Sequence, residues 1–174
     1  MSFEIPIPPS GEPEWPYDLY QLLRKERVSQ ISYVPDAGHK VLINSSLADP
    51  EVHSIPLTTE EEGVAMSVGA HWGGERHVVL IQSSGVVNFI NMLSLPRLGK
   101  FPFLALISMR GDFGEGNPWQ MPMGKSIRPV LEACDIVCLK IKEPFEVLST
   151  VSAAITMSFQ CNESVCVLLG QKLL

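Results

Sequence analysis

The sequence predicts an α/β protein in which a six-stranded parallel sheet lies between two layers of helices. Apolar runs of strand length alternate with helical periodicities along the chain, as in folds built from strand–helix–strand units. The run from His77 to Gln82 is apolar almost without interruption, which is typical of a strand buried on both faces. A length of 174 residues with 45% hydrophobic and 18% charged residues suits one domain with a sizeable core.

The elements follow in a regular order. Strands are predicted at residues 28–34, 52–57, 77–82, 101–109, 136–141 and 164–169. Helices are predicted at residues 15–27, 39–47, 86–95, 126–133 and 144–160, and another begins at Glu60 and closes on glycines. A long loop covers residues 110–124, and the acidic, proline-rich residues 1–14 form an extended arm before the domain of residues 15–174.

Charge and composition exclude several classes of protein. The net charge of −6 and the lack of a basic run argue against a nucleic-acid surface. The longest apolar helix candidate, residues 147–159, is too short to span a bilayer, so a cytoplasmic location is expected. The four cysteines and four histidines show no ligand spacing; buried free thiols and no metal site built by this chain alone are predicted.

Three consecutive carboxylates, Glu60 to Glu62, stand between a strand and an apolar helix. Acidic residues suit the first turn of a helix, and Thr58 or Thr59 is a plausible N-cap. A second interpretation is that one carboxylate belongs to a site, because open α/β sheets bind ligands beyond the carboxyl ends of their strands. Both interpretations stay open on the residues alone.

Other polar groups follow predicted strands at the same edge. They are Asp36 after Pro35, the segment Gln82–Gly85, and the loop after Met109. The glycine fingerprints of dinucleotide-binding, P-loop and nucleophile-elbow proteins are absent from the sequence. The polar strand ends therefore predict a crevice of another type.

These residues, in this order, resemble the pyrimidine-binding domain of thiamine-diphosphate enzymes. The likeness is to the alpha subunit of sulfopyruvate decarboxylase and to the matching half of phosphonopyruvate decarboxylase, over residues 15–169. Its motifs here are Glu60-Glu61-Glu62-Gly63, Gln82-Ser83-Ser84-Gly85-Val86-Val87-Asn88, and Arg110-Gly111…Gly114-Glu115 followed by Gln120-Met121-Pro122-Met123-Gly124. The resemblance implies the three-layer thiamine-diphosphate-binding fold.

The resemblance also implies the role of the glutamate. In the family, a glutamate at this position hydrogen-bonds N1′ of the aminopyrimidine ring and promotes removal of the thiazolium C2 proton, and the cofactor then serves as electron sink for decarboxylation of a 2-oxo acid. The register assigns this role to Glu60, with Glu61 and Glu62 as helix-start carboxylates. Gln82, Ser84, Gly85 and Asn88 are the further cofactor-binding candidates.

The half of such enzymes that holds the diphosphate and magnesium carries G-D-G and, some thirty residues later, N-N. Gly111-Asp112-Phe113 has no asparagine pair downstream. A partner beta subunit with these motifs is therefore expected to supply the Mg²⁺ ligands, and this chain alone is expected to form a homo-oligomer. The apolar residues 63–73 and 86–95 are the candidate contact faces.

The implied substrate is a small anionic 2-oxo acid, with Asp36, Arg110 and Gln120 as candidate contacts. Two residues depart from the family pattern: Ser83 stands for an asparagine and Val87 for a glycine. Sulfopyruvate decarboxylation is thus one of three readings. The others are a phosphonopyruvate or other pyruvate-type decarboxylase subunit, and a non-catalytic binding module. Trp119 fits either an interface or a lid.

Overall fold

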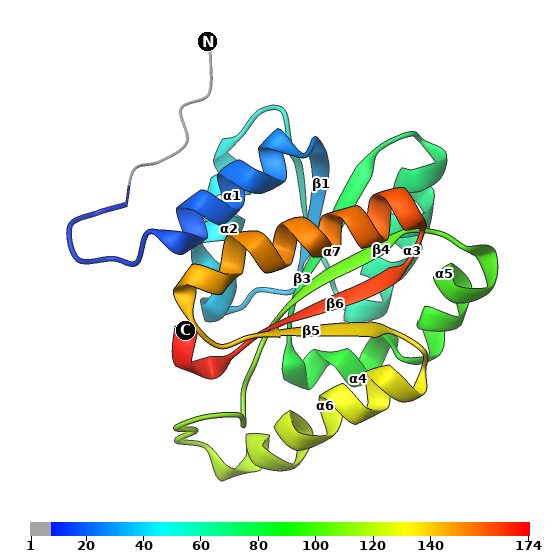
Figure 1. Cartoon of the computed structure of the whole chain (residues 1–174). Helices are drawn as coiled ribbons and strands as arrows, with labels where there is room; N and C mark the ends of the chain where they lie inside the picture. Colours follow the sequence, from blue (N-terminus) through cyan, green and yellow to red (C-terminus); the bar gives the residue numbers. More distant parts are fainter. Residues whose placement is uncertain (1–7) are drawn as a thin grey trace.

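All six predicted strands form one parallel sheet in the order β2-β1-β3-β4-β6-β5 (Figure 1). The strands are β1 (Val28–Tyr33), β2 (His53–Pro56), β3 (Arg76–Gln82), β4 (Phe103–Ser108), β5 (Val137–Ile141) and β6 (Ser164–Leu169). This computed structural model describes residues 8–174, so the first half of the predicted arm lies outside the described residues. The prediction of an α/β fold with a six-stranded parallel sheet is confirmed.

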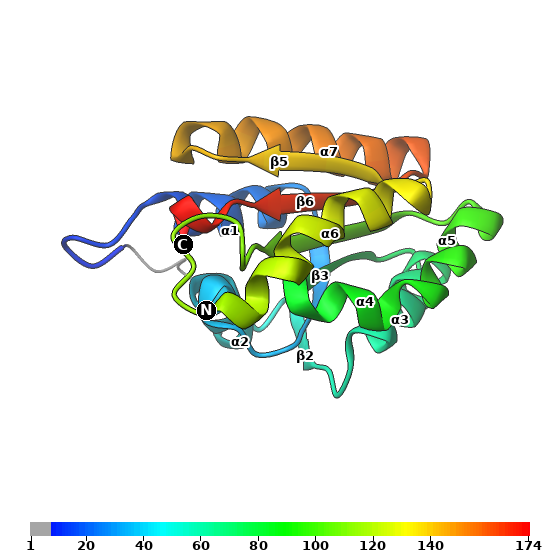
Figure 2. The same cartoon turned by 90° about the horizontal axis from the view of Figure 1, so that it is seen from below.

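Helices cover both faces of the sheet, as Figure 2 shows. They are α1 (Trp15–Lys25), α2 (Lys40–Ala48), α3 (Glu60–Trp72), α4 (Val86–Phe89), α5 (Ser94–Gly99), α6 (Met121–Ala133) and α7 (Val147–Cys161). Buried side chains of α1, α2 and α7 share one core cluster with β1 and β6, and those of α3, α4 and α6 share a second cluster with β3 and β4. Within residues 8–174 no helix is long and apolar enough to cross a membrane.

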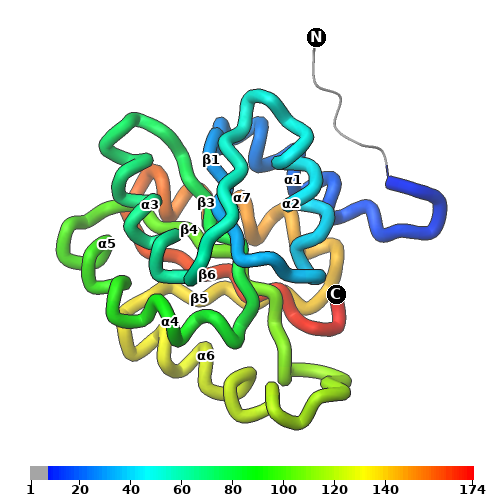
Figure 3. The backbone as a smooth tube through the Cα atoms, turned by 180° about the vertical axis from the view of Figure 1, so that it is seen from behind, coloured from blue at the N-terminus to red at the C-terminus, as the bar shows by residue number. Residues whose placement is uncertain are grey.

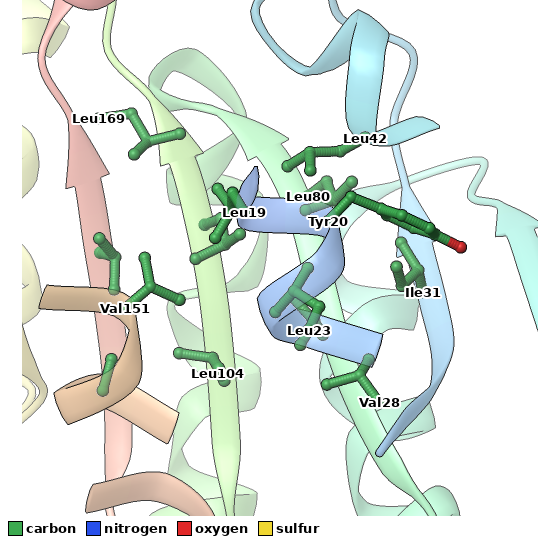
Figure 4. Packing of buried hydrophobic residues seen from close by; sticks show 14 of the residues in the cluster. Leu19, Tyr20, Leu23, Val28, Ile31, Leu42, Leu80, Leu104, Val151 and Leu169 are labelled. Carbon is green, nitrogen blue, oxygen red and sulfur yellow. The ribbon is translucent and has the colours of Figure 1, made fainter. Parts of the chain in front are cut away.

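The first cluster is the larger one, and Figure 4 shows it from close by. Leu19 and Leu23 of α1 lie over Leu80 and Leu104 of the sheet, and all four side chains are fully buried. Tyr20 directs its hydroxyl away from this cluster and donates a hydrogen bond to buried Asp49 at 3.0 Å. The amphipathic pattern predicted for residues 15–27 therefore has its apolar side in the core.

Two helix boundaries differ from prediction. The helix expected at residues 86–95 is interrupted after Phe89 by the short turn Asn91–Leu93, because the ring of Pro96 clashes with a straight helix through the preceding turn. The helix expected from residue 126 begins at Met121, since Pro122 suits a first helical turn. The predicted long loop is shortened accordingly.

The cysteines have no disulfide or metal partner in the described part of the chain. Cys166 is buried in the sheet, and Cys134 and Cys138 are partly buried. Cys161 is exposed at the end of α7, so the prediction of buried thiols is wrong for this residue.

A glycine lets helix α3 pack closely against the sheet at Gly63. A Cβ added at Gly63 would lie 2.8 Å from Cγ1 of Val79 in β3. One turn later, Ser67 Oγ lies 2.7 Å from Nδ1 of His77, and burial lowers the pKa of His77 to about 3, which keeps that ring neutral. These two contacts fix the depth and rotation of the helix that carries Glu60.

Gly63 and Gly69 lie in the same helix and provide a matched test of this packing. Gly63→Ala is expected to lower the free energy of unfolding by about 1–3 kcal/mol, because the added methyl overpacks the α3–β3 contact. Gly69→Ala is expected to raise it by up to about 1 kcal/mol, because no atom lies within 4 Å of its added Cβ and alanine favours a helix. Urea unfolding of both variants measures the change in the free energy of unfolding. The same change in both variants would contradict the close packing at Gly63.

Candidate functional site

The carboxyl ends of β1 and β3 lie side by side at the centre of one sheet edge. From β1 the chain runs to β2 on one side, whereas from β3 it runs to β4 on the other. This reversal is the topological switch point at which open α/β sheets bind ligands. Asp36 and Gln82–Gly85 follow these two strands, and the start of α3 lies beside them, so the predicted crevice has its polar groups at the switch point.

The three carboxylates at the start of α3 have different surroundings. Glu62 accepts hydrogen bonds from the backbone N–H groups of Thr58 at 2.7 Å and Thr59 at 3.4 Å, completing a capping box with N-cap Thr59. Glu61 is exposed. Glu60 is only 8% exposed and points toward the turn after β3. Glu62 therefore has the predicted helix-start role, and Glu60 is the residue left for other chemistry.

Glu60 lies against the turn after β3 through two contacts. Asn88 Nδ2 donates a hydrogen bond to Glu60 Oε2 at 2.7 Å, which orients the carboxylate. The Cα of Gly85 lies so close that a Cβ at this position would overlap the Glu60 carboxylate. Oε1 of Glu60 has no hydrogen-bond donor among residues 8–174. The result is a nearly buried carboxylate with one fixed oxygen and one spare acceptor, as a ligand N–H requires.

Gln82 and Ser84, which are predicted to bind the cofactor, join a second cluster around Asp36. Oδ1 of Asp36 accepts from Gln82 Nε2 at 2.8 Å, and Gln82 Oε1 accepts from Ser84 Oγ at 2.7 Å. Oδ2 of Asp36 accepts from Ser108 Oγ at 2.6 Å and from Gly38 N at 3.0 Å. The turn after β3 thus contacts two carboxylates, Glu60 through Gly85 and Asn88, and Asp36 through Gln82.

The loop after β4 forms a third part of the site. Arg110 makes a two-pronged ion pair with Glu115, and its backbone N–H donates to Ser83 Oγ at 2.9 Å. Ser83, the departure from the family pattern, therefore joins the turn after β3 to the loop after β4. Figure 3 shows this loop beside the C-terminal end of the chain, to which Gln171 ties it.

The remaining predicted residues lie at the margin of the site. Gln120 packs its backbone carbonyl against Gly111 and makes no side-chain hydrogen bond within residues 8–174. Trp119 is 86% exposed on the same loop, and Val87 is exposed on α4.

Sequence reasoning did not single out Ser108, Glu115 or Gln171 as site residues. Ser108 is a polar residue at the end of an otherwise apolar buried strand, which is the signal that identified Asp36. Glu115 lies inside a motif that was noted for its arginine and glycines. Gln171 gave no local signal, because only the tertiary fold brings the residues after β6 beside the loop after β4.

The described residues suit an aminopyrimidine but provide no metal site. The spare Oε1 of Glu60 is the acceptor that a ring N–H donor requires, and Gly85 makes room for this carboxylate because it has no side chain. No group of three His, Cys, Asp or Glu side chains within residues 8–174 is arranged to hold a metal ion.

Several known proteins are similar to the chain in sequence or in fold. No protein-family model matches it. It is 34% identical over 152 residues to the sulfopyruvate decarboxylase subunit alpha of Methanococcus maripaludis, covering 87% of this chain and 91% of that protein. The same subunit of Methanocaldococcus jannaschii is 34% identical over 151 residues, covering 86% of this chain and 89% of that protein.

Two further matches are more distant. The phosphonopyruvate decarboxylase of Streptomyces viridochromogenes is 30% identical over 138 residues, which are 78% of this chain and 35% of that protein. The structure of 2-oxoglutarate:ferredoxin oxidoreductase from Magnetococcus marinus superposes with a TM-score of 0.69 at 12% identity, covering 91% of this chain and 29% of that one. The second match shows the fold alone. By identity and coverage, the chain belongs to the family of sulfopyruvate decarboxylase alpha subunits.

Proposed function

We propose that this chain is the pyrimidine-binding subunit of a two-chain, thiamine-diphosphate-dependent decarboxylase that acts on sulfopyruvate or a similar small anionic 2-oxo acid. The main support for this proposal is the carboxylate of Glu60, which is nearly buried, oriented by Asn88, and left with one free acceptor oxygen beside Gly85. The names of the relatives support a decarboxylase subunit. The phosphonopyruvate decarboxylase match favours a second candidate, a subunit acting on the phosphonate analogue.

Each group would have a defined part in the reaction. When bound, thiamine diphosphate supplies the electron sink for loss of CO₂. Glu60 Oε1 would accept the hydrogen bond of the ring nitrogen N1′ and so promote proton removal at C2, while Asn88 keeps the carboxylate in place. Gly85 leaves room for the Glu60 carboxylate, which lies where a side chain would otherwise be. Gln82 and Ser84 would border the ring from the Asp36 side, and Asp36, Arg110 and Gln120 are the proposed substrate contacts.

The partner subunit is proposed to supply the Mg²⁺ and diphosphate site, with the G-D-G and N-N motifs that this sequence lacks. We propose that the partner covers a surface on α3 and α5. This α3–α5 surface consists of Ala65, Gly69, Trp72, Leu95 and Leu98. Trp72 is 75% exposed and Leu98 is 87% exposed, which is unusual for large apolar side chains unless another chain covers them. The site of action is proposed to be the cytoplasm.

Substitution of Glu60 tests the proton-transfer role. In the reconstituted two-chain enzyme, Glu60→Gln is expected to slow exchange of the cofactor C2 proton by about two to four orders of magnitude, because the amide cannot supply the charge that drives it. Proton NMR in deuterium oxide measures this exchange separately from turnover. Glu61→Gln is the matched control, since Glu61 is exposed on the same turn and contributes at most about 1 kcal/mol to helix stability. Slow exchange in Glu61→Gln together with fast exchange in Glu60→Gln would show that Glu61, and not Glu60, has the proton-transfer role.

Cofactor binding tests the division between the chains. This chain alone is expected to bind thiamine diphosphate weakly, with no dependence on Mg²⁺, because its described residues hold no metal cluster. Addition of the partner subunit should produce tight binding that disappears when EDTA removes the metal. Isothermal titration calorimetry measures both states. Tight, Mg²⁺-dependent binding to the isolated chain would contradict the two-chain proposal.

Oligomeric state tests the α3–α5 surface. Without its partner the chain is expected to form homo-oligomers at micromolar concentration, and Leu98→Arg should shift it toward monomer, because a charge at the centre of an apolar contact is costly to bury. Multi-angle light scattering gives the mass. Phe145→Arg, on an exposed phenylalanine before α7, is the control. A wild-type chain that is monomeric at these concentrations would rule out this surface as a self-association face.

A further inference from the structure

The most densely bonded carboxylate of the described site is that of Glu115, which lies outside the predicted site residues. Its side chain is 1% exposed. Oε2 accepts from Arg110 Nε at 2.8 Å, from Gly111 N at 2.9 Å and from Gln171 Nε2 at 2.9 Å. Oε1 accepts from Arg110 Nη2 at 2.7 Å and from Asn117 N at 2.9 Å. Five donors from three chain segments therefore meet at one side chain.

These bonds give the loop after β4 one fixed conformation. The Arg110 guanidinium and the N–H groups of Gly111 and Asn117 hold the pKa of the Glu115 carboxyl well below its usual range, so it stays charged at neutral pH. Gln171 also accepts from the backbone N–H groups of Asp112 at 3.0 Å and Phe113 at 3.2 Å. The segment after β6 thus clamps the loop from its other side.

Arg110 keeps part of its hydrogen-bonding capacity free. A guanidinium has five N–H donors, and Glu115 uses two of them. The other three have no acceptor among residues 8–174, and Arg110 lines a cavity of about 240 Å³ together with Asp36, Ser108 and Gln171. The oxygens of Asp36 already accept from Gly38, Gln82 and Ser108. Asp36 therefore does not use the three free N–H groups of Arg110. A ligand that accepts hydrogen bonds from these groups has to be rich in acceptor oxygens.

A 2-oxo acid with a second anionic group offers two such ends. A fixed arginine on the carboxylate would stabilise the ground state more than the transition state, because that group loses its charge as CO₂ departs. The terminal sulfonate or phosphonate keeps its charge throughout, so an arginine bound there does not oppose the reaction. Planar, two-pronged donors also match the oxygens of such a group.

We propose that Glu115 and Gln171 are positioning residues that hold Arg110 to bind the terminal anionic group of the substrate, and that this arrangement determines specificity. The inference rests on the proposed function for the identity of the substrate. It adds two residues that act through Arg110.

Substrate pairs separate positioning from a general structural role. In the reconstituted enzyme, Glu115→Gln is expected to raise KM for sulfopyruvate about 10- to 100-fold, the value of an oriented bond to a charged group, with kcat within about threefold. Turnover of pyruvate, which has no terminal anion, should be unchanged. Gln171→Ala should raise KM for sulfopyruvate in the same direction by a smaller factor, because it removes one of five donors. Glu132→Gln is the control, since Glu132 pairs with Arg128 on an exposed face.

An inert anion separates this inference from the proposed function. In calorimetry, 3-sulfopropanoate should bind more weakly to the two-chain assembly with Glu115→Gln or Gln171→Ala than to the wild type. This anion has no 2-oxo group to react, so the measurement reports binding alone. If the wild type binds this anion through Arg110 but decarboxylates neither substrate, the proposed function fails and the positioning role stands. Equal losses for sulfopyruvate and pyruvate, or unchanged binding and KM in both variants, overturn the positioning role. Should Glu115→Gln not fold, Gln171→Ala decides.

Discussion

The close approach of Gly85 to Glu60 is the constraint on which the candidate site depends. A carboxylate can be nearly buried at a helix start and still reach a ligand only if the opposing backbone carries no side chain there. Asn88, one turn further along, fixes one carboxylate oxygen and leaves the other free. The depth of α3, set by Gly63 against Val79, brings Glu60 to the level of this turn. A substitution of Gly85, Asn88 or Gly63 would therefore leave Glu60 in the chain but shift the position of its carboxylate.

One short segment, residues 82–88, connects the parts of the site. It contacts Glu60 through Gly85 and Asn88, Asp36 through Gln82, and the loop after β4 through Ser83. A shift of this segment is therefore felt on both the cofactor side and the substrate side. Ser83 has a structural use of its own, because its hydroxyl accepts the backbone N–H of Arg110.

The fold was predictable because periodicity and burial act locally. Each strand and most helices are encoded by runs of residues whose pattern reflects their own two faces. The position of Glu60 was also predictable, since a strand end and a helix start adjoin in the sequence. The break after Phe89 depends on Pro96, seven residues later, and was missed although the proline is visible.

The partners of side chains were less predictable. Gln82 and Ser84 were expected at the cofactor, but the hydrogen bonds from Gln82 to Asp36, 46 positions earlier, and from Ser84 to Gln82 were not predicted. Glu115 and Gln171 are 56 positions apart and meet only because β6 lies next to β4. Such pairings depend on the order and register of several strands, which cannot be read from hydrophobic patterns in the sequence. They are the part of a site that needs three-dimensional coordinates.

The strand order has a consequence for synthesis of the protein. β6 is the last strand in the sequence, yet it lies between β4 and β5, which are both made before it. Until residues 164–169 leave the ribosome, β4 and β5 both lack β6, the strand that pairs with each of them, and each keeps an open edge. Gln171 follows directly and reaches Glu115 only once β6 is inserted. The loop around Arg110 is therefore completed only after residues 164–171 have been made, so a nascent chain that stops before them carries no finished site.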